Sequence, residues 1–208
     1  MGTKRLPKDP YNIIITGVGG QGNVLASRVL ANMLVLQGYD VTIGETFGAS
    51  QRGGSVMSHI RVSAGGAWSP QIPKGMADMV VSLEPVEAIR VMKDYGNEAV
   101  RILVNDRPIY PVGVIAGELN YPARDEIEEA LKGLSKYVWF IDATEEAIRL
   151  GNPILGNVIM IGAACGLGIL PVGRDAFAEV MKGSLAADRL EINLAAFDLG
   201  AGKLAATA

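Results

Sequence analysis

The chain has 208 residues, of which 49% are hydrophobic and 20% charged, with a formal net charge of −3. This length predicts one α/β domain over residues 1–208, with an N-terminal extension at 1–10 and a fraying tail at 201–208. Basic and acidic residues number 19 and 22 and are interspersed, so no basic field favours nucleic acid. The high apolar share indicates a surface that a partner covers.

Cys165 is the only cysteine. An iron–sulfur cluster needs about four thiolates, and a zinc site usually needs two to four Cys or His ligands. We therefore expect this chain alone to bind no metal and to form no disulfide. The polar residues 1–10 contain no apolar targeting run, and we expect a cytoplasmic protein.

Residues 150–173 carry no charge and are numerous enough to cross a bilayer. Pro153, Pro171 and six glycines interrupt this run. It is therefore better explained as a buried helix, in which Gly162 and Gly166 let another backbone approach closely. We expect no membrane span.

Strand-like and helix-like patterns alternate along the chain. The predicted strands are residues 12–16, 41–45, 55–62, 77–83, 100–105 and 137–142. The predicted helices are residues 24–34, 85–95, 124–134, 144–150, 158–167, 175–181 and 185–199. This order predicts an α/β fold: an open, mostly parallel, Rossmann-like sheet with helices on both faces and a helical C-terminal part.

Residues 17–22 read Gly-Val-Gly-Gly-Gln-Gly and join the first predicted strand to the first predicted helix. In that context G-x-G-x-x-G binds a dinucleotide, and Glu45 ends the second predicted strand, where an acid can bind ribose. A glycine-rich first turn also forms where helix and strand pack tightly without a ligand. The motif alone leaves both interpretations open, although Gln21 favours contact with a polar group.

A second glycine-rich segment, residues 47–55, leaves the second predicted strand at its carboxyl end. Ligands of open α/β sheets bind at that edge. Arg52 and the backbone amides around it can hold an anion. An ordinary turn with one solvated arginine explains the segment equally well.

The remaining chemical groups favour structural roles. His59 has no second histidine and no obvious nucleophile to act with, and Cys165 resembles a small buried apolar residue. We assign no catalytic residue. The acidic positions of residues 124–134 form a solvated helix face, and the proline-bounded segment 69–75 suits a loop that docks on a neighbour.

Four segments together resemble one family: GVGGQG at 17–22, ETFGASQRGGSVMSHIR at 45–61, SPQIPKGMADMVVSLEP at 69–85 and GNVIMIGAACGLGILP at 156–171. The sequence is similar to the gamma subunit of 2-oxoacid:ferredoxin oxidoreductases. Residues 51–61 look most like the indolepyruvate type, in which this subunit is called beta.

The resemblance implies an accessory subunit of a complex that oxidatively decarboxylates a 2-oxoacid, such as indolepyruvate or another arylpyruvate, to an acyl-coenzyme A. Electrons pass to ferredoxin, and thiamine diphosphate and iron–sulfur clusters lie mainly on partner subunits. The isolated chain is expected to be inactive and to form a homodimer. The expected contacts with coenzyme A or a partner are Gly17, Gly19, Gly20, Gln21, Gly22, Ser50, Gln51, Arg52, Gly53 and Gly54.

Two alternatives stay open on sequence grounds. One is a free-standing NAD- or FAD-binding Rossmann-type protein built on the turn at 17–22 and Glu45. The other is a purely structural interaction subunit, whose apolar surface serves only to bury against a partner.

Overall fold

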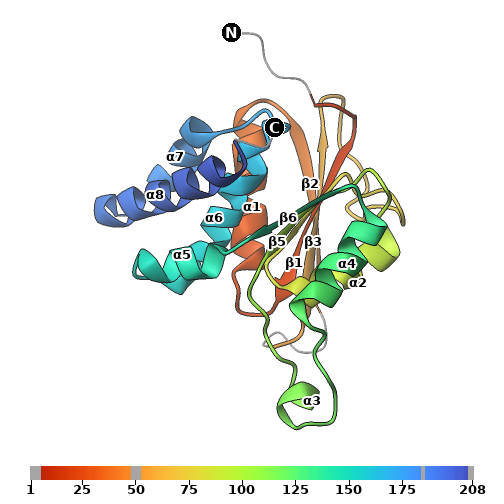
Figure 1. Cartoon of the computed structure of the whole chain (residues 1–208). Helices are drawn as coiled ribbons and strands as arrows, with labels where there is room; N and C mark the ends of the chain where they lie inside the picture. Colours follow the sequence, from red (N-terminus) through yellow and green to blue (C-terminus); the bar gives the residue numbers. More distant parts are fainter. Residues whose placement is uncertain (1–5, 48–52, 184–185, 206–208) are drawn as a thin grey trace.

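The computed structural model describes residues 6–47, 53–183 and 186–205, and within them six strands form one sheet (Figure 1). The order across the sheet is β2-β3-β1-β4-β5-β6. The strands are β1 (Tyr11–Val18), β2 (Asp40–Phe47), β3 (Ser55–Ser63), β4 (Met79–Ser82), β5 (Arg101–Asn105) and β6 (Tyr137–Ile141). Each predicted strand is present with shifted ends.

The sheet is mostly parallel, but one strand is reversed. β1, β4, β5 and β6 pair in parallel, whereas β3 pairs antiparallel with both β1 and β2. The short connection from Phe47 to Ser55 explains this, because parallel neighbours need a crossover of about a dozen residues or more. The predicted α/β fold is confirmed, and the reversal of β3 is an addition to it.

Helices cover both faces of the sheet, as Figure 1 shows. On one face lie α1 (Asn23–Leu36), α5 (Ala143–Arg149), the short 3₁₀ helix η1 (Pro153–Leu155), α6 (Gly156–Gly166), α7 (Arg174–Lys182) and α8 (Ala187–Leu204). On the other face lie α2 (Pro85–Tyr95) and α4 (Arg124–Leu134). In β1, Ile13 and Ile15 face the first layer and Ile14 faces the second, so this strand is apolar on both sides.

The uncharged run forms η1 and α6, and α6 packs on α8 through glycines. A β-carbon added to Gly162 would lie 2.1 Å from the carbonyl oxygen of Phe197, and one added to Gly200 would lie 1.9 Å from that of Ile159. The predicted close approach at Gly162 is therefore confirmed. No helix in the described part of the chain is long and apolar enough to cross a membrane. α8 continues to Leu204, four residues into the tail expected to fray.

The segment 69–75 packs against its own sheet. Arg61 on β3 donates to the carbonyl of Ser69 at 3.1 Å and to Oδ1 of Asn12 at 3.1 Å. Ile72 is buried and donates its backbone N–H to Nδ1 of His59 at 3.4 Å. Docking of this segment on a neighbouring subunit stays a prediction.

Residues 107–123, here called the arm, project beyond the carboxyl edge of the sheet (Figure 1). The arm carries the short helix α3 (Val112–Ile115), which the sequence pattern did not reveal. Val112 and Ile115 are 81% and 75% exposed. The root of the arm is fixed by Glu84, whose buried carboxylate accepts from the backbone N–H of Ile109 at 3.3 Å and from the hydroxyl of Tyr121.

Candidate functional site

The sheet has a topological switch point between β1 and β4. α1 follows β1 on one face of the sheet, and α2 follows β4 on the opposite face. The chain also continues toward opposite edges of the sheet from these two strands. After β1 it goes to β2 at one edge, and after β4 it goes to β5 in the direction of the other edge. Ligands of open α/β sheets bind in the crevice that such an arrangement opens at the carboxyl ends of the strands. The glycine motif of residues 17–22 occupies this position.

Gln21 holds the turn in shape. Its side-chain oxygen accepts from the backbone N–H of Val18 at 2.8 Å, and its side-chain nitrogen donates to the carbonyl of Leu83 at 2.7 Å. The polar contact expected of Gln21 is thus made to the chain's own backbone. These two hydrogen bonds connect the end of β1 with the residue that follows β4.

Gly22 is the N-cap residue of α1. Its φ is +85°, and no side chain makes a capping hydrogen bond to the helix. No acidic residue lies in its first turn. The positive end of the helix dipole therefore has no negative side chain beside it, which favours an anion at this place.

The two glycine-rich segments meet at this edge. Gly19 donates its backbone N–H to the carbonyl of Gly54 at 2.8 Å, and Gly53 donates to the carbonyl of Gly19 at 3.4 Å. Gly20 and Gly22 belong to the same turn, whereas Gly17 lies near the end of β1 and pairs with Val56 on β3. Ser50, Gln51 and Arg52 lie outside the described residues.

A cavity of about 510 Å³, here called the switch-point cavity, lies beside the turn. It is lined by residues from the ends of β4 and β5, the root of the arm, α5, η1 and α6 as well as the turn itself. They are Gly20, Gln21, Leu83, Asn105, Arg107, Pro108, Ile109, Thr144, Asn152, Pro153, Ile154, Gly156 and Asn157. Only Gly20 and Gln21 were among the predicted contacts.

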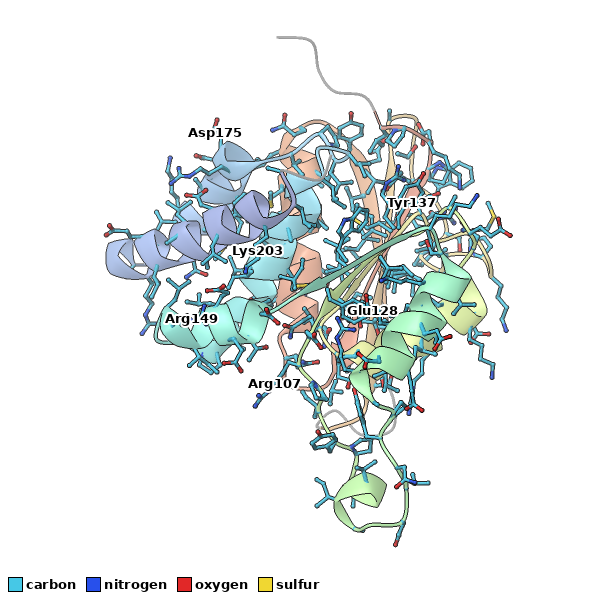
Figure 2. The ribbon with its side chains drawn as sticks, in the orientation of Figure 1. Arg107, Glu128, Tyr137, Arg149, Asp175 and Lys203 are labelled. Carbon is cyan, nitrogen blue, oxygen red and sulfur yellow. The ribbon has the colours of Figure 1, made fainter. Side chains whose placement is uncertain are left out.

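The donors around the switch-point cavity suit an anionic or strongly polar ligand. Asn157 is 4% exposed, and its side-chain nitrogen has no hydrogen-bond partner among the described residues. Arg107, labelled beside the root of the arm in Figure 2, lies 3.6 Å from Glu145. Both side chains of that pair are more than half exposed, so the pair is weak and Arg107 can turn toward a ligand.

Asn105 shows how sequence reasoning could have found more of this site. It ends the buried strand β5, and its side chain donates to the carbonyl of Leu83 at 3.1 Å and to the hydroxyl of Thr144 at 2.9 Å. A polar residue closing an apolar strand was the available signal. Asn157 gave no such signal, because it lies within a long apolar run.

His59 and Cys165 lie apart from the residues that line this cavity. His59 faces the α2 layer, where its ring makes an edge contact with Tyr95 at 5.0 Å between centroids, and burial lowers its pKa. Burial raises the pKa of the Cys165 thiol to about 12. In the described part of the chain, no group of three or more His, Cys, Asp or Glu side chains could hold a metal ion.

Glu45 does not stand where a dinucleotide site needs it. β3 lies between β1 and β2, so Glu45 on β2 is two strands away from the glycine turn. Its carboxylate lies 3.6 Å from the guanidinium of Arg28. In the Rossmann arrangement the ribose-binding acid follows the strand adjacent to β1. The geometry therefore does not support the NAD alternative.

The fold and the site define a doubly wound α/β protein with a ligand crevice at its switch point. The sequence matches the family model "Pyruvate ferredoxin/flavodoxin oxidoreductase" over residues 12–202. The chain belongs to this family. The family resemblance that the four sequence segments indicated is thereby confirmed.

Two curated relatives named for different 2-oxoacids differ in their sequence identity to this chain. The chain is 40% identical over 194 residues to "Indolepyruvate oxidoreductase subunit IorB" of Pyrococcus horikoshii, covering 91% of this chain and 94% of the relative. It is 27% identical over 183 residues to "Pyruvate/ketoisovalerate oxidoreductases common subunit gamma" of Pyrococcus furiosus, covering 85% and 88%.

A solved structure supports the fold. A 2-oxoglutarate:ferredoxin oxidoreductase from Magnetococcus marinus, solved with 2-oxoglutarate, coenzyme A and succinyl-CoA bound, superposes with a TM-score of 0.73 at 20% identity. The match covers 97% of this chain and 32% of that chain. The same fold is thus found as one part of a longer polypeptide.

Proposed function

We propose that this chain is the accessory subunit of an indolepyruvate or arylpyruvate:ferredoxin oxidoreductase. The observation that carries the proposal is the 40% identity to a subunit named for indolepyruvate, over 91% of the chain. Identity to the pyruvate/ketoisovalerate relative is only 27%. The overall reaction is oxidative decarboxylation of the 2-oxoacid to an acyl-coenzyme A, with electrons passing to ferredoxin.

The chemistry of decarboxylation and electron transfer belongs to partner subunits in this proposal. Thiamine diphosphate and iron–sulfur clusters supply it there. This chain has one cysteine, Cys165, and it is buried. An iron–sulfur cluster needs about four thiolates, so the residues of this chain do not fit one. A cytoplasmic location agrees with a chain that can form no internal disulfide.

The role proposed for this chain is to hold coenzyme A or to border its path at the switch-point cavity. The orphan side-chain nitrogen of Asn157 supports this, as do the uncapped N-terminus of α1 and Arg107. These donors suit a phosphate. Gly17, Gly19, Gly20, Gln21 and Gly22 shape the turn, and residues 50–54 complete the proposed contact surface.

The first experiment is to co-purify the chain with its native partners and to assay viologen reduction anaerobically with a panel of 2-oxoacids plus coenzyme A. We expect a coloured complex that prefers arylpyruvates. A complex that prefers pyruvate or 2-oxoglutarate would contradict the proposed indolepyruvate or arylpyruvate substrate. A chain that purifies without partners and binds NADH stoichiometrically would contradict the proposal of an accessory oxidoreductase subunit.

The contact surface is tested in the same complex with Asn157→Ala and Arg52→Ala. Each is expected to raise the apparent KM for coenzyme A with little change in KM for the 2-oxoacid. Asn193→Ala is the matched control, since Asn193 on α8 does not line the switch-point cavity and bonds the carbonyl of Arg189. An unchanged apparent KM for coenzyme A in both variants would contradict the proposal that this surface contacts coenzyme A. A loss of complex assembly alone would favour a purely structural role.

A further inference from the structure

A second cavity, of about 670 Å³, lies among α1, η1, α6, α7 and α8, and is called here the helical groove. Its wall includes Val29, Val158 and Met181, which are buried, while Leu25 and Ile154 are about half exposed. The volume lies in the range of small-molecule sites, which are mostly apolar with a few convergent polar groups. The helical groove therefore has the size and the apolar wall that a bound organic molecule needs.

Among the described residues that line the helical groove, the charged ones are both arginines. Arg28 and Arg189 line it, and none of its fourteen lining residues is acidic. Arg28 is 3.6 Å from Glu45, but the Arg28 side chain is 64% exposed, so this pair holds it weakly. Among the described carboxylates none pairs with Arg189. Two guanidinium groups on an apolar cavity favour an anion through their local charge and their hydrogen-bond donors.

Asn157 adds a buried donor to this cavity. Asn157 lines the helical groove as well as the switch-point cavity, and its buried side-chain nitrogen has no partner among the described residues. A buried donor without a partner costs free energy. A ligand oxygen in either cavity would satisfy it, so the two arginines and not Asn157 distinguish the helical groove from the switch-point cavity.

We propose that the helical groove binds an organic carboxylate with an apolar body, such as an aromatic ring. The ring packs on Val29, Val158 and Met181, and the carboxylate is bound by Arg28 and Arg189. The inference does not rest on the coenzyme A proposal, because the residues that would bind this ligand are absent from the switch-point cavity: Arg28, Arg189, Val29, Val158 and Met181. The two cavities share only Asn152, Ile154 and Asn157.

The test uses the full-length chain and three probes with one ring system: indole-3-acetate, neutral indole and cationic tryptamine. Titration calorimetry is expected to show saturable 1:1 binding of indole-3-acetate, with indole and tryptamine at least about tenfold weaker. The double variant Arg28→Gln with Arg189→Gln should raise the Kd of indole-3-acetate by about tenfold or more. Arg90→Gln, on α2 of the opposite face, should leave its Kd within about twofold.

A second variant keeps the proposal falsifiable if the arginine changes disturb the fold. Val180→Phe fills the groove from a partly exposed position on α7 and should abolish binding while preserving the unfolding temperature. The proposal is overturned if indole-3-acetate shows no saturable binding, or if indole binds as tightly. Displacement of indole-3-acetate by coenzyme A would also overturn it, because the groove would then belong to the coenzyme A site.

Discussion

Gly22 and Asn157 touch so closely that a β-carbon on Gly22 would lie 2.2 Å from the side-chain nitrogen of Asn157. Residue 22 is the N-cap of α1 and residue 157 lies in α6, so this contact joins the two helices beside the switch-point cavity. Glycine is favoured at position 22 for two reasons: its φ of +85° is left-handed, and a β-carbon there would displace the side chain of Asn157.

Gly22→Ala is expected to destabilise the chain by more than the strain of a left-handed residue, which is about 1–2 kcal/mol. The extra cost comes from displacing Asn157. Gly38→Ala is the matched control, because Gly38 has the same φ of +85° and nothing within 4 Å of an added β-carbon. Chemical denaturation of both variants measures the difference, and adding Asn157→Ala to Gly22→Ala should recover the extra cost. Equal losses at positions 22 and 38 would contradict the contact.

The α6–α8 contact gives a prediction about packing alone. Gly200→Ala would place a methyl group 1.9 Å from the carbonyl oxygen of Ile159, and backbone cannot move aside without separating the helices. We expect a loss of about 3 kcal/mol or more in the free energy of unfolding. Gly202→Ala, two residues along the same helix, meets nothing within 4 Å and should stabilise by up to about 1 kcal/mol. Similar unfolding midpoints for the two variants would show that the helices are not in close contact.

The sequence predicted the layers of this fold well, because strands and helices alternate with clear periodicity. Pro85–Tyr95 and Arg124–Leu134 match the predicted helices at both ends. The direction of β3 was missed, since its alternation of side chains is the same whether the strand runs parallel or antiparallel to its neighbours. The arm was missed because residues 107–123 are mostly irregular and carry only the four-residue helix α3.

The candidate site was predictable only where the local pattern was strong. The turn at residues 17–22 carries a recognisable spacing of glycines, and it does lie at the switch point. Asn105, Thr144 and Asn157 come from three distant segments that the topology alone brings together. A single sequence contains no signal for that meeting. The partner of Asn157 in space, Gly22, is 135 residues away in the chain.

Tyr121 and Glu84 fix the arm to the sheet, and this contact can be tested directly. Tyr121→Phe removes a hydroxyl that donates to a buried carboxylate, which is expected to cost about 1.5–3 kcal/mol and to speed hydrogen exchange across the arm. Tyr110→Phe is the control, because the ring of Tyr110 is 53% exposed and its edge contact with Tyr121 survives the change. If both variants exchange alike, the hydrogen bond from Tyr121 to Glu84 does not hold the arm.

Cys165 is predicted to be inert in the folded chain. Burial raises the pKa of its thiol to about 12, so at pH 8 roughly one molecule in ten thousand carries the reactive thiolate. A thiol reagent such as 5,5′-dithiobis(2-nitrobenzoate) should leave the native chain unlabelled at pH 8 and label it fully in denaturant. Rapid labelling without denaturant would contradict the burial.

Glu87 and Glu146 should change stability with pH in opposite directions. Burial raises the pKa of the Glu87 carboxyl above its usual 4.5, so the native state holds that proton more tightly than the unfolded chain does. The stabilisation is present below about pH 4.5 and is lost as pH rises through the raised pKa. Glu87→Gln removes this loss and should raise the unfolding temperature more at pH 7 than at pH 4.

For Glu146, a hydrogen bond from Lys203 holds the pKa of the carboxyl below 4.5, so its stabilisation is present above pH 4.5 and is lost as pH falls through the lowered pKa. Glu146→Gln should therefore lower the unfolding temperature at pH 7 and have less effect at acid pH. The pair forms its own control, because both variants exchange a carboxylate for an amide of the same shape. Scanning calorimetry from pH 3.5 to 8 tests both, and the same sign of pH dependence in the two variants would contradict the assigned causes.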